Sequence, residues 1–380
     1  MKGESEKHKA KRKKLIITIV SLLSGAFVVI LILILINAYV FPLEYLSTLV
    51  NLPKAYERQN GELAVHFVDV GQGDATVIEF PDGKTMLIDG GGEECTHLLR
   101  YIRALKIKKF DYLMLSHPDT DHCGGLDDVL KLYGAKEIFI PYCPNENINS
   151  AYFRFTSQIK KMAKEGITVH ISQKYSLIHS ENEENFYYAM VLSPLPEELD
   201  GSYYNDLCDS EITDEEVNDT SAVLYLEYAQ TRFLFTGDIG ERVESDIIKN
   251  CLVLGKDAYF YQTELNGVEL ALTPNLFNID VLKISHHGSS KSSTEEFLQL
   301  VSPKHAVISV GKGNLYGHPS PTVISRITAA NANCKILRTD VQGDIVITVT
   351  QKGETSFVGA VKKIVTYYRK KTLFGVDIND

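Results

Sequence analysis

The stretch Ser116-His117-Pro118-Asp119-Thr120-Asp121-His122-Cys123-Gly124-Gly125 carries, within six residues, four side chains of types that can bind a metal. It follows the apolar run Phe110–Leu115, which is typical of a buried strand, and the end of such a strand is where a sheet presents side chains to a ligand. His117 and Asp119 point to the same side of an extended segment, whereas the adjacent Asp121 and His122 diverge. One loop can therefore supply two neighbouring metal positions.

The residue types in this loop suit divalent ions. Imidazole together with carboxylate is a ligand set for zinc or manganese, and Gly124-Gly125 permits a turn into a helix that begins near Leu126. A surface loop without an ion rarely has this order of His and Asp residues. We predict one or two divalent ions, with His117, Asp119, Asp121 and His122 as ligands and Asp121 also in a catalytic role.

Six further motifs accompany the loop along the chain: Asp69–Ala75 (DVGQGDA), Leu87–Gly91 (LIDGG), Leu234–Ile239 (LFTGDI), Lys283–Ser289 (KISHHGS), Asn314–Pro319 (NLYGHP) and Arg338–Asp344 (RTDVQGD). In this order they resemble the metallo-beta-lactamase fold, with Asp119 in place of the usual second His, and in particular the hydrolase domain of ComEC-type competence DNA-uptake proteins. The resemblance runs from about Leu63 to Val349. It implies a four-layer αβ/βα sandwich and a metal-dependent hydrolase that cleaves phosphodiesters, with nucleic acid as the first substrate class to test.

Two of these motifs extend the predicted ligand set. Asp238 follows a strand hairpin formed by Ser221–Tyr228 and Thr231–Phe235, so its carboxylate can reach the metal loop and bridge two ions; the alternative is a cap for a helix that begins near Gly240. His286 and His287 follow the buried strand Ile279–Ile284. One is expected to bind metal and the other to contact phosphate or orient a ligand, and the sequence does not assign the two roles.

Other side chains are expected to support the site. Asp89 ends a strand and is predicted to orient the metal ligands from behind. Asp69 and Asp74 either share this duty or cap the Gly-Gln-Gly turn between them. Lys283 and Ser289, in the motif of the paired histidines, are predicted to contact substrate.

One ligand typical of the family is missing. Enzymes of this fold usually add a His at a strand end between the metal loop and the bridging Asp, where this chain has Leu192-Ser193-Pro194. The first metal position then has only His117, Asp119 and Asp238, unless His318 or Asp219 completes it. His318 is otherwise predicted to protonate the leaving oxygen or hold a phosphate oxygen, or simply to pack within its loop.

The N-terminal segment is of another kind. A cluster of Lys and Arg residues precedes Leu15–Ile36, which has no charged residue and is long enough to cross a bilayer. A signal peptide has a shorter apolar region and a small-residue cleavage site, so we expect an uncleaved anchor with a cytoplasmic N-terminus. The predicted divisions are 1–14 basic cytoplasmic tail, 15–36 transmembrane helix, 37–61 juxtamembrane linker, 62–360 extracytoplasmic hydrolase domain, and 361–380 basic tail.

Apolar runs and turn signals place the remaining elements. We expect the strand Phe186–Leu192 to continue the first sheet and Arg338–Val349 to close the second. The acidic stretch Leu195–Asp219, which has no Lys or Arg, is predicted to be a solvated insertion.

Composition limits the function classes. A formal charge of −10 weakens any claim of broad nucleic-acid affinity without excluding a local basic groove. The six cysteines form no CxxC pair, and Cys123 is expected to pack under the metal loop rather than bind metal.

Two other functions stay open. One is hydrolysis of a cell-wall or lipid-linked phosphodiester such as a phosphocholine ester. The other is a non-catalytic role in a DNA-uptake or envelope assembly. The full uptake protein is expected to carry a channel of many helices, so this chain, with one such helix, is not expected to conduct DNA alone.

Overall fold

The computed structural model describes residues 2–39, 42–143, 148–194, 214–265, 268–359 and 364–367. They belong to two compact units, Met1–Leu52 and Pro53–Asp380. Most of the acidic stretch, residues 195–213, lies outside the described residues, and its last part contains the short helix α7, Asp214–Asn218. Most of the predicted basic tail also lies outside them.

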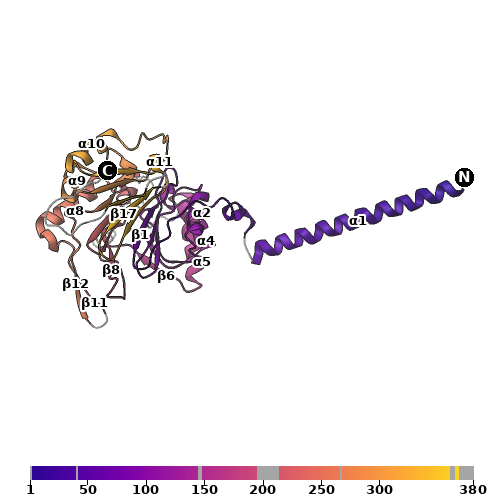
Figure 1. The fold of residues 1–380 in the computed structure, drawn as a ribbon, viewed down its shortest axis with the longest axis horizontal. Coiled ribbons are helices and arrows are strands. Elements are labelled where there is room, and N and C mark those ends of the chain that lie inside the picture. The colour runs from indigo at the N-terminus through magenta and orange to yellow at the C-terminus, as the bar shows by residue number, and fades with distance from the viewer. Residues whose placement is uncertain are drawn as a thin grey trace. The chain divides into compact units, whose positions relative to one another are not determined.

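The first unit consists of helix α1, Lys2–Tyr39, and the 3-10 helix η1, Leu43–Leu49 (Figure 1). Within α1, Lys11–Leu35 is long and apolar enough to cross a membrane by length and composition. Its large apolar side chains are exposed rather than packed against protein, so α1 is a candidate membrane span.

The second unit begins with a nine-stranded sheet in the order β18-β17-β16-β1-β2-β3-β4-β5-β6. Its strands are β1 Leu63–Phe67, β2 Thr76–Glu79, β3 Thr85–Ile88, β4 Phe110–Met114, β5 Ala135–Ile140, β6 Thr168–Ile171, β16 Ile345–Val349, β17 Thr355–Gly359 and β18 Ile364–Tyr367. Strands β3 to β6 run parallel to one another, so the loops that follow them emerge at one edge.

A seven-stranded sheet has the order β15-β14-β13-β10-β9-β8-β7. Its strands are β7 Leu177–His179, β8 Tyr187–Ser193, β9 Val223–Tyr228, β10 Thr231–Phe235, β13 Val281–Lys283, β14 His305–Ile308 and β15 Lys335–Arg338. Strands β10 and β13 are parallel neighbours, so the Asp238 motif and the paired histidines follow adjacent strand ends. Strands β11, Tyr261–Leu265, and β12, Val268–Leu272, form a separate hairpin.

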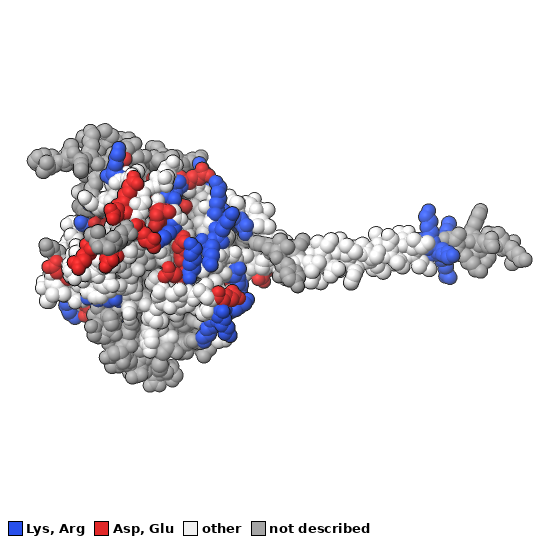
Figure 2. All heavy atoms as spheres, turned by 90° about the horizontal axis from the view of Figure 1, so that it is seen from below, with Lys and Arg blue, Asp and Glu red and all other residues white. Residues whose placement is uncertain are grey.

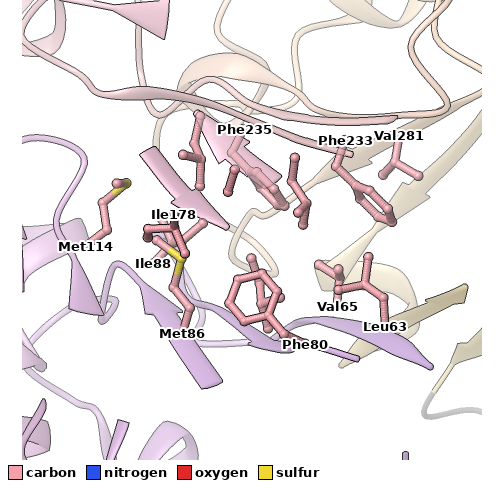
Figure 3. Close-up of a cluster of buried hydrophobic side chains, with 14 of the residues drawn as sticks. Leu63, Val65, Phe80, Met86, Ile88, Met114, Ile178, Phe233, Phe235 and Val281 are labelled. Atoms are coloured by element: carbon pink, nitrogen blue, oxygen red, sulfur yellow. The ribbon is translucent and has the colours of Figure 1, made fainter. Parts of the chain in front are cut away.

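The core between the sheets is apolar and closely packed. Val65 of β1 and Phe80, which directly follows β2, face Phe233 and Phe235 of the second sheet (Figure 3). Phe80 stacks on Tyr187 of β8 with ring centroids 4.3 Å apart. This burial between the two sheets supplies the main favourable term in folding. It also fixes the positions of the strand ends that carry the sequence motifs relative to one another.

Helices cover the outer faces and complete four layers (Figure 1). On the first sheet they are α2 Thr96–Ala104, α4 Leu126–Leu132 and α5 Ser150–Ala163, and on the second α8 Glu241–Leu254, α9 Glu295–Val301 and α10 Pro321–Ala330. The amphipathic face of α8 buries Val243 and Ile247 in the same cluster as Leu282 of β13. The four-layer sandwich is the fold implied by the sequence motifs.

Three assignments of position were wrong. Strand β8 lies in the second sheet rather than the first, and β16 pairs with β1 of the first sheet rather than closing the second. Strand β18 also pairs with β17 beyond residue 360, where a tail was expected. All five residues of β16 are buried, and such a strand suits either sheet, so the sequence pattern does not show which edge it joins.

Candidate metal centre

The metal loop follows β4 as expected. After Met114 the chain passes through the short helix α3, Thr120–Cys123, and enters α4 at Leu126. His117 and His122 are buried, whereas the side chains of Asp119 and Asp121 are 34% and 35% exposed. The loop therefore places two imidazoles in the interior and two carboxylates at the edge of the site that faces solvent.

Neighbouring turns pack closely on this loop. The Asp74 N–H donates to the Asp121 carbonyl (3.1 Å), and the Gly90 N–H donates to the His122 carbonyl (2.7 Å). Gly73 has φ +130°, and a Cβ atom there would collide with the Asp121 carbonyl. Glycine in the DVGQGD turn thus allows Asp74 to approach the metal loop.

Four side chains from four segments converge. Asp74, His122, Asp238 and His287 each offer a ligand atom, and these atoms all lie within 4.8 Å of one another. Asp238 Oδ2 is 3.3 Å from Nε2 of both His122 and His287. His287 Nε2 is also 3.2 Å from Asp121 Oδ2, which extends the cluster towards the rim.

The histidines are held by their far nitrogen atoms. His122 Nδ1–H donates to Asp89 Oδ2 (2.8 Å), and His287 Nδ1–H donates to the Ser309 carbonyl (2.9 Å). The Ser116 hydroxyl donates to Asp89 Oδ2 (2.7 Å), so its oxygen accepts from His117 Nδ1 (3.0 Å). In the neutral form, each Nε2 then carries a lone pair that points inwards.

Several of the atoms that point into the cluster lack a hydrogen-bond partner among the described residues. Nε2 of His117, His122 and His287 and Oδ1 of Asp74 are buried and have no hydrogen-bond partner among the described residues. Leaving buried polar atoms unpaired is costly. A divalent cation would satisfy lone pairs of this kind from imidazole and carboxylate at once, so the donor set fits such an ion.

The charges of the cluster are strongly coupled. Burial alone would raise the pKa of Asp238, but His287, His122 and Lys283 outweigh it and hold that pKa well below its usual value. Burial alone would lower the pKa of His287, but Asp238 and Asp74 outweigh it and raise that pKa to about 10. The carboxylates thus attract positive charge, whether protons or a cation.

Lys283 occupies a different place from the one predicted. Its ammonium is buried and donates to the Gly237 carbonyl (2.9 Å), lies 3.4 Å from Asp238 Oδ1, and pairs with Asp74. At the end of β13 the side chain points into the carboxylates rather than to a substrate surface. A contact between Lys283 and substrate therefore stays a prediction.

Asp74, Asp89 and Asp69 take three different places. Asp74 lies inside the four-residue cluster rather than behind it, and Asp89 lies behind His122 as expected. Asp69 Oδ1 accepts from the Gly71 N–H (3.2 Å), which is the turn-capping alternative. Ser289 is buried, and its hydroxyl accepts from the Lys291 N–H (3.4 Å).

The paired histidines separate in space. His287 is buried in the cluster, whereas His286 is half-buried and its ring centroid lies 5.8 Å from that of His318. Both have positive φ, 50° and 52°, a conformation that is uncommon for a residue with a side chain. The structure brings His287 into the four-residue cluster that could hold a metal and leaves His286 and His318 beside it.

The first metal position stays short of one imidazole. His117 Nε2 lies 3.5 Å from Asp119 Oδ2, and the centroids of the His117 and His122 rings are 4.1 Å apart. Ser193 stands at the end of β8, where a further His was sought. Asp219 instead accepts from the Gly240 N–H (3.1 Å) and pairs with Arg242, so it does not fill the gap.

A cavity of about 620 Å³ opens beside the cluster. Its lining includes Thr120 and Asp121 of the metal loop, Gln72, and the loop residues Asn314, Leu315 and Tyr316. Gln72, Ser116 and Ser309 were not predicted as parts of the site. Ser116 directly precedes His117, so its role could have been recognised from the sequence. Nothing in the sequence around Ser309 indicates that its carbonyl orients His287.

The family model described as the metallo-beta-lactamase superfamily matches residues 68–312. The metallo-beta-lactamase fold protein YhfI from Bacillus subtilis aligns with a TM-score of 0.41 at 10% identity, covering 72% of this chain and 96% of that one.

Two curated relatives align with about three quarters of this chain. ComE operon protein 3 of Bacillus subtilis (strain 168) is 27% identical over 76% of this chain and 33% of its own length. Competence protein ComA of Neisseria gonorrhoeae is 28% identical over 74% of this chain and 32% of its own length. The chain spans about a third of the length of these relatives. It belongs to the metallo-beta-lactamase superfamily, and its sequence resembles part of these longer relatives.

Proposed function

We propose that this protein is a divalent-metal-dependent phosphodiesterase that acts on nucleic acid. The observation that carries the proposal is the set of buried, unpaired imidazole nitrogens of His117, His122 and His287, arranged around Asp238 and next to an open cavity. Buried imidazole nitrogens beside carboxylates are costly for folding unless protons or a divalent cation complete the arrangement. The relatives named as competence proteins favour nucleic acid as the substrate class.

The ligands divide into two groups that share Asp238. His122, His287 and Asp74 form the fuller group, with Asp121 at its edge, and His117 and Asp119 form the poorer one. A divalent ion bound in such a site acidifies water and neutralises charge on a phosphate. The high share of carboxylates among these ligands favours manganese, whereas a site made only of imidazoles would favour zinc.

The remaining residues position the substrate. Burial lowers the pKa of both His286 and His318, so both imidazoles are neutral at neutral pH and offer an N–H to a phosphate oxygen. This supports holding a phosphate oxygen as the role of His318, ahead of protonating the leaving group, because an acid of low pKa is mostly deprotonated before reaction.

Charge on the surface is mixed rather than uniformly acidic. On the face seen in Figure 2, Lys and Arg side chains gather into clusters beside the Asp and Glu side chains. Lys312 is exposed and adjoins Gly313, which lines the cavity. A local cluster of this kind attracts a phosphate backbone even where net charge is negative.

Helix α1 is proposed to anchor the chain, with the hydrolase domain on the extracytoplasmic side. The basic residues before the apolar stretch support this orientation through the excess of Lys and Arg on cytoplasmic segments. The substrate would then be met outside the cytoplasm.

Metal content and hydrolysis, measured together on the full chain in detergent, test the proposal. We expect nearer one tightly held ion than two, and more activity on bis-p-nitrophenyl phosphate and on DNA with added manganese than with zinc. Asp238→Asn should lose metal and activity, whereas Asp111→Asn, remote from the site, should keep both. Cleavage of a phosphocholine ester but not of DNA would assign the alternative substrate, and metal-loaded protein inert to every phosphodiester would refute the enzyme.

A further inference from the structure

The loop Gly311–Pro319 presents two large apolar side chains to solvent beside the cavity. Leu315 is 100% exposed and Tyr316 is 73% exposed, although both line the cavity that Asp121 shares. An exposed leucine alone is ordinary. Two adjacent apolar side chains at the mouth of a catalytic cavity are better explained by contact with a ligand.

The loop is braced rather than loose. The Asn314 side chain donates to the Gly311 and His318 carbonyls (3.1 and 2.7 Å) and accepts from the His318 N–H (3.0 Å). Gly317 has φ +72°, which lets the chain turn sharply after the tip. Tyr316 is therefore held in place before any ligand arrives, and this lowers the entropic cost of binding.

A series of aromatic rings leads from the metal cluster to Tyr316. The ring centroids of His287 and His286 are 6.2 Å apart, those of His286 and His318 are 5.8 Å apart, and those of His318 and Tyr316 are 5.8 Å apart. The last pair is stacked, with an interplanar angle of 18°. His318 thus supports one face of Tyr316.

We infer that Tyr316 is a stacking platform for the nucleobase next to the scissile phosphate. The site would then bind single-stranded nucleic acid through a base as well as through a phosphate. The inference rests on the proposed function, because it places the scissile phosphate at the metal cluster. Base stacking on an exposed aromatic ring tolerates any base and contributes about 1–3 kcal/mol. Leu315 adds apolar contact at the same mouth.

The absence of tryptophan from the chain permits a direct test. Tyr316→Trp introduces the one indole of the protein at the proposed contact. In the presence of manganese, a phosphorothioate oligothymidylate, which resists hydrolysis, should quench its fluorescence, and an abasic oligomer of equal length should not. Phe260→Trp, a half-exposed aromatic position outside the cavity lining, should respond to neither.

Kinetics supply a second readout. Tyr316→Ala should raise KM for oligothymidylate about tenfold, with less effect on kcat, and Tyr316→Phe should bring KM back towards the wild-type value. Leu315→Ala should raise KM less, because it removes apolar area without a ring.

The outcomes separate the two proposals. Equal quenching by base-bearing and abasic oligomers, or no quenching by either in a protein that hydrolyses phosphodiesters, overturns the stacking role alone. Base-dependent quenching in a protein that hydrolyses no phosphodiester supports stacking and refutes the proposed function.

Discussion

His122 Nδ1 lies 2.8 Å from Asp89 Oδ2. Since a carboxylate accepts only, the imidazole must donate from Nδ1, and its Nε2 is left for a metal. Asp89→Asn puts an amide N–H where an acceptor is needed. We expect metal affinity to fall about 10–100-fold while the fold survives. Equilibrium dialysis measures the loss, and unchanged affinity would show that Asp89 does not orient His122.

Lys283 neutralises two buried carboxylates in the absence of a metal. In Lys283→Met, Asp74 and Asp238 remain buried without their ammonium partner, which costs about 3–5 kcal/mol. The metal-free variant should therefore melt at a markedly lower temperature, and added manganese should restore much of the loss.

Lys304→Met is the matched control. Lys304 pairs with Asp280 at 2.6 Å but is 43% exposed, so its loss should cost less than about 1 kcal/mol. Equal destabilisation of the two variants would contradict the role assigned to the buried ammonium.

Metal binding should depend steeply on pH. Carboxylates raise the pKa of His287 to about 10 and that of His122 well above its usual value, against the opposing effect of burial. Below these pKa values protons compete with the metal for the same nitrogens, so affinity should rise with pH, about tenfold per unit for each proton displaced. Calorimetry in buffers of different ionisation enthalpy counts the protons. A binding constant independent of pH from 6 to 9 would contradict protonation of these imidazoles in the metal-free site.

The local part of the site was predictable from the sequence. His117, Asp119, Asp121 and His122 come from one loop, and strand and helix periodicity place that loop at the end of β4. The same patterns identified the β9–β10 hairpin before Asp238. Such features depend on neighbours in the chain, which a single sequence contains.

Features that depend on distant neighbours were not predictable. The pattern around Lys283 is that of a strand end, and only the packing of the DVGQGD turn against β13 turns its side chain towards Asp74. His286 and His287 are adjacent and chemically alike, and the Ser309 carbonyl, which accepts from His287, directly follows β14. The apolar runs of β8 and β16 likewise fit either sheet.

The proposed orientation of the anchor makes a cellular prediction. A protease added to intact cells should degrade the chain after Gly61 and leave residues 1–14 protected, because the basic tail is expected on the cytoplasmic side. Tags placed at the N-terminus and on the domain report the two fragments separately. A protected domain would overturn the orientation and leave the chemistry of the site unaffected.

The pairing of β1 with β16 has a consequence for biogenesis. Leu63 opens the first sheet, and its partner Val349 lies near the end of the described chain. When the polypeptide emerges from its N-terminus, the backbone N–H and C=O groups of β1 that pair with β16 stay unpaired until almost all of the domain has emerged. An exposed strand edge invites pairing with other chains, so assistance by a chaperone matters most during this interval.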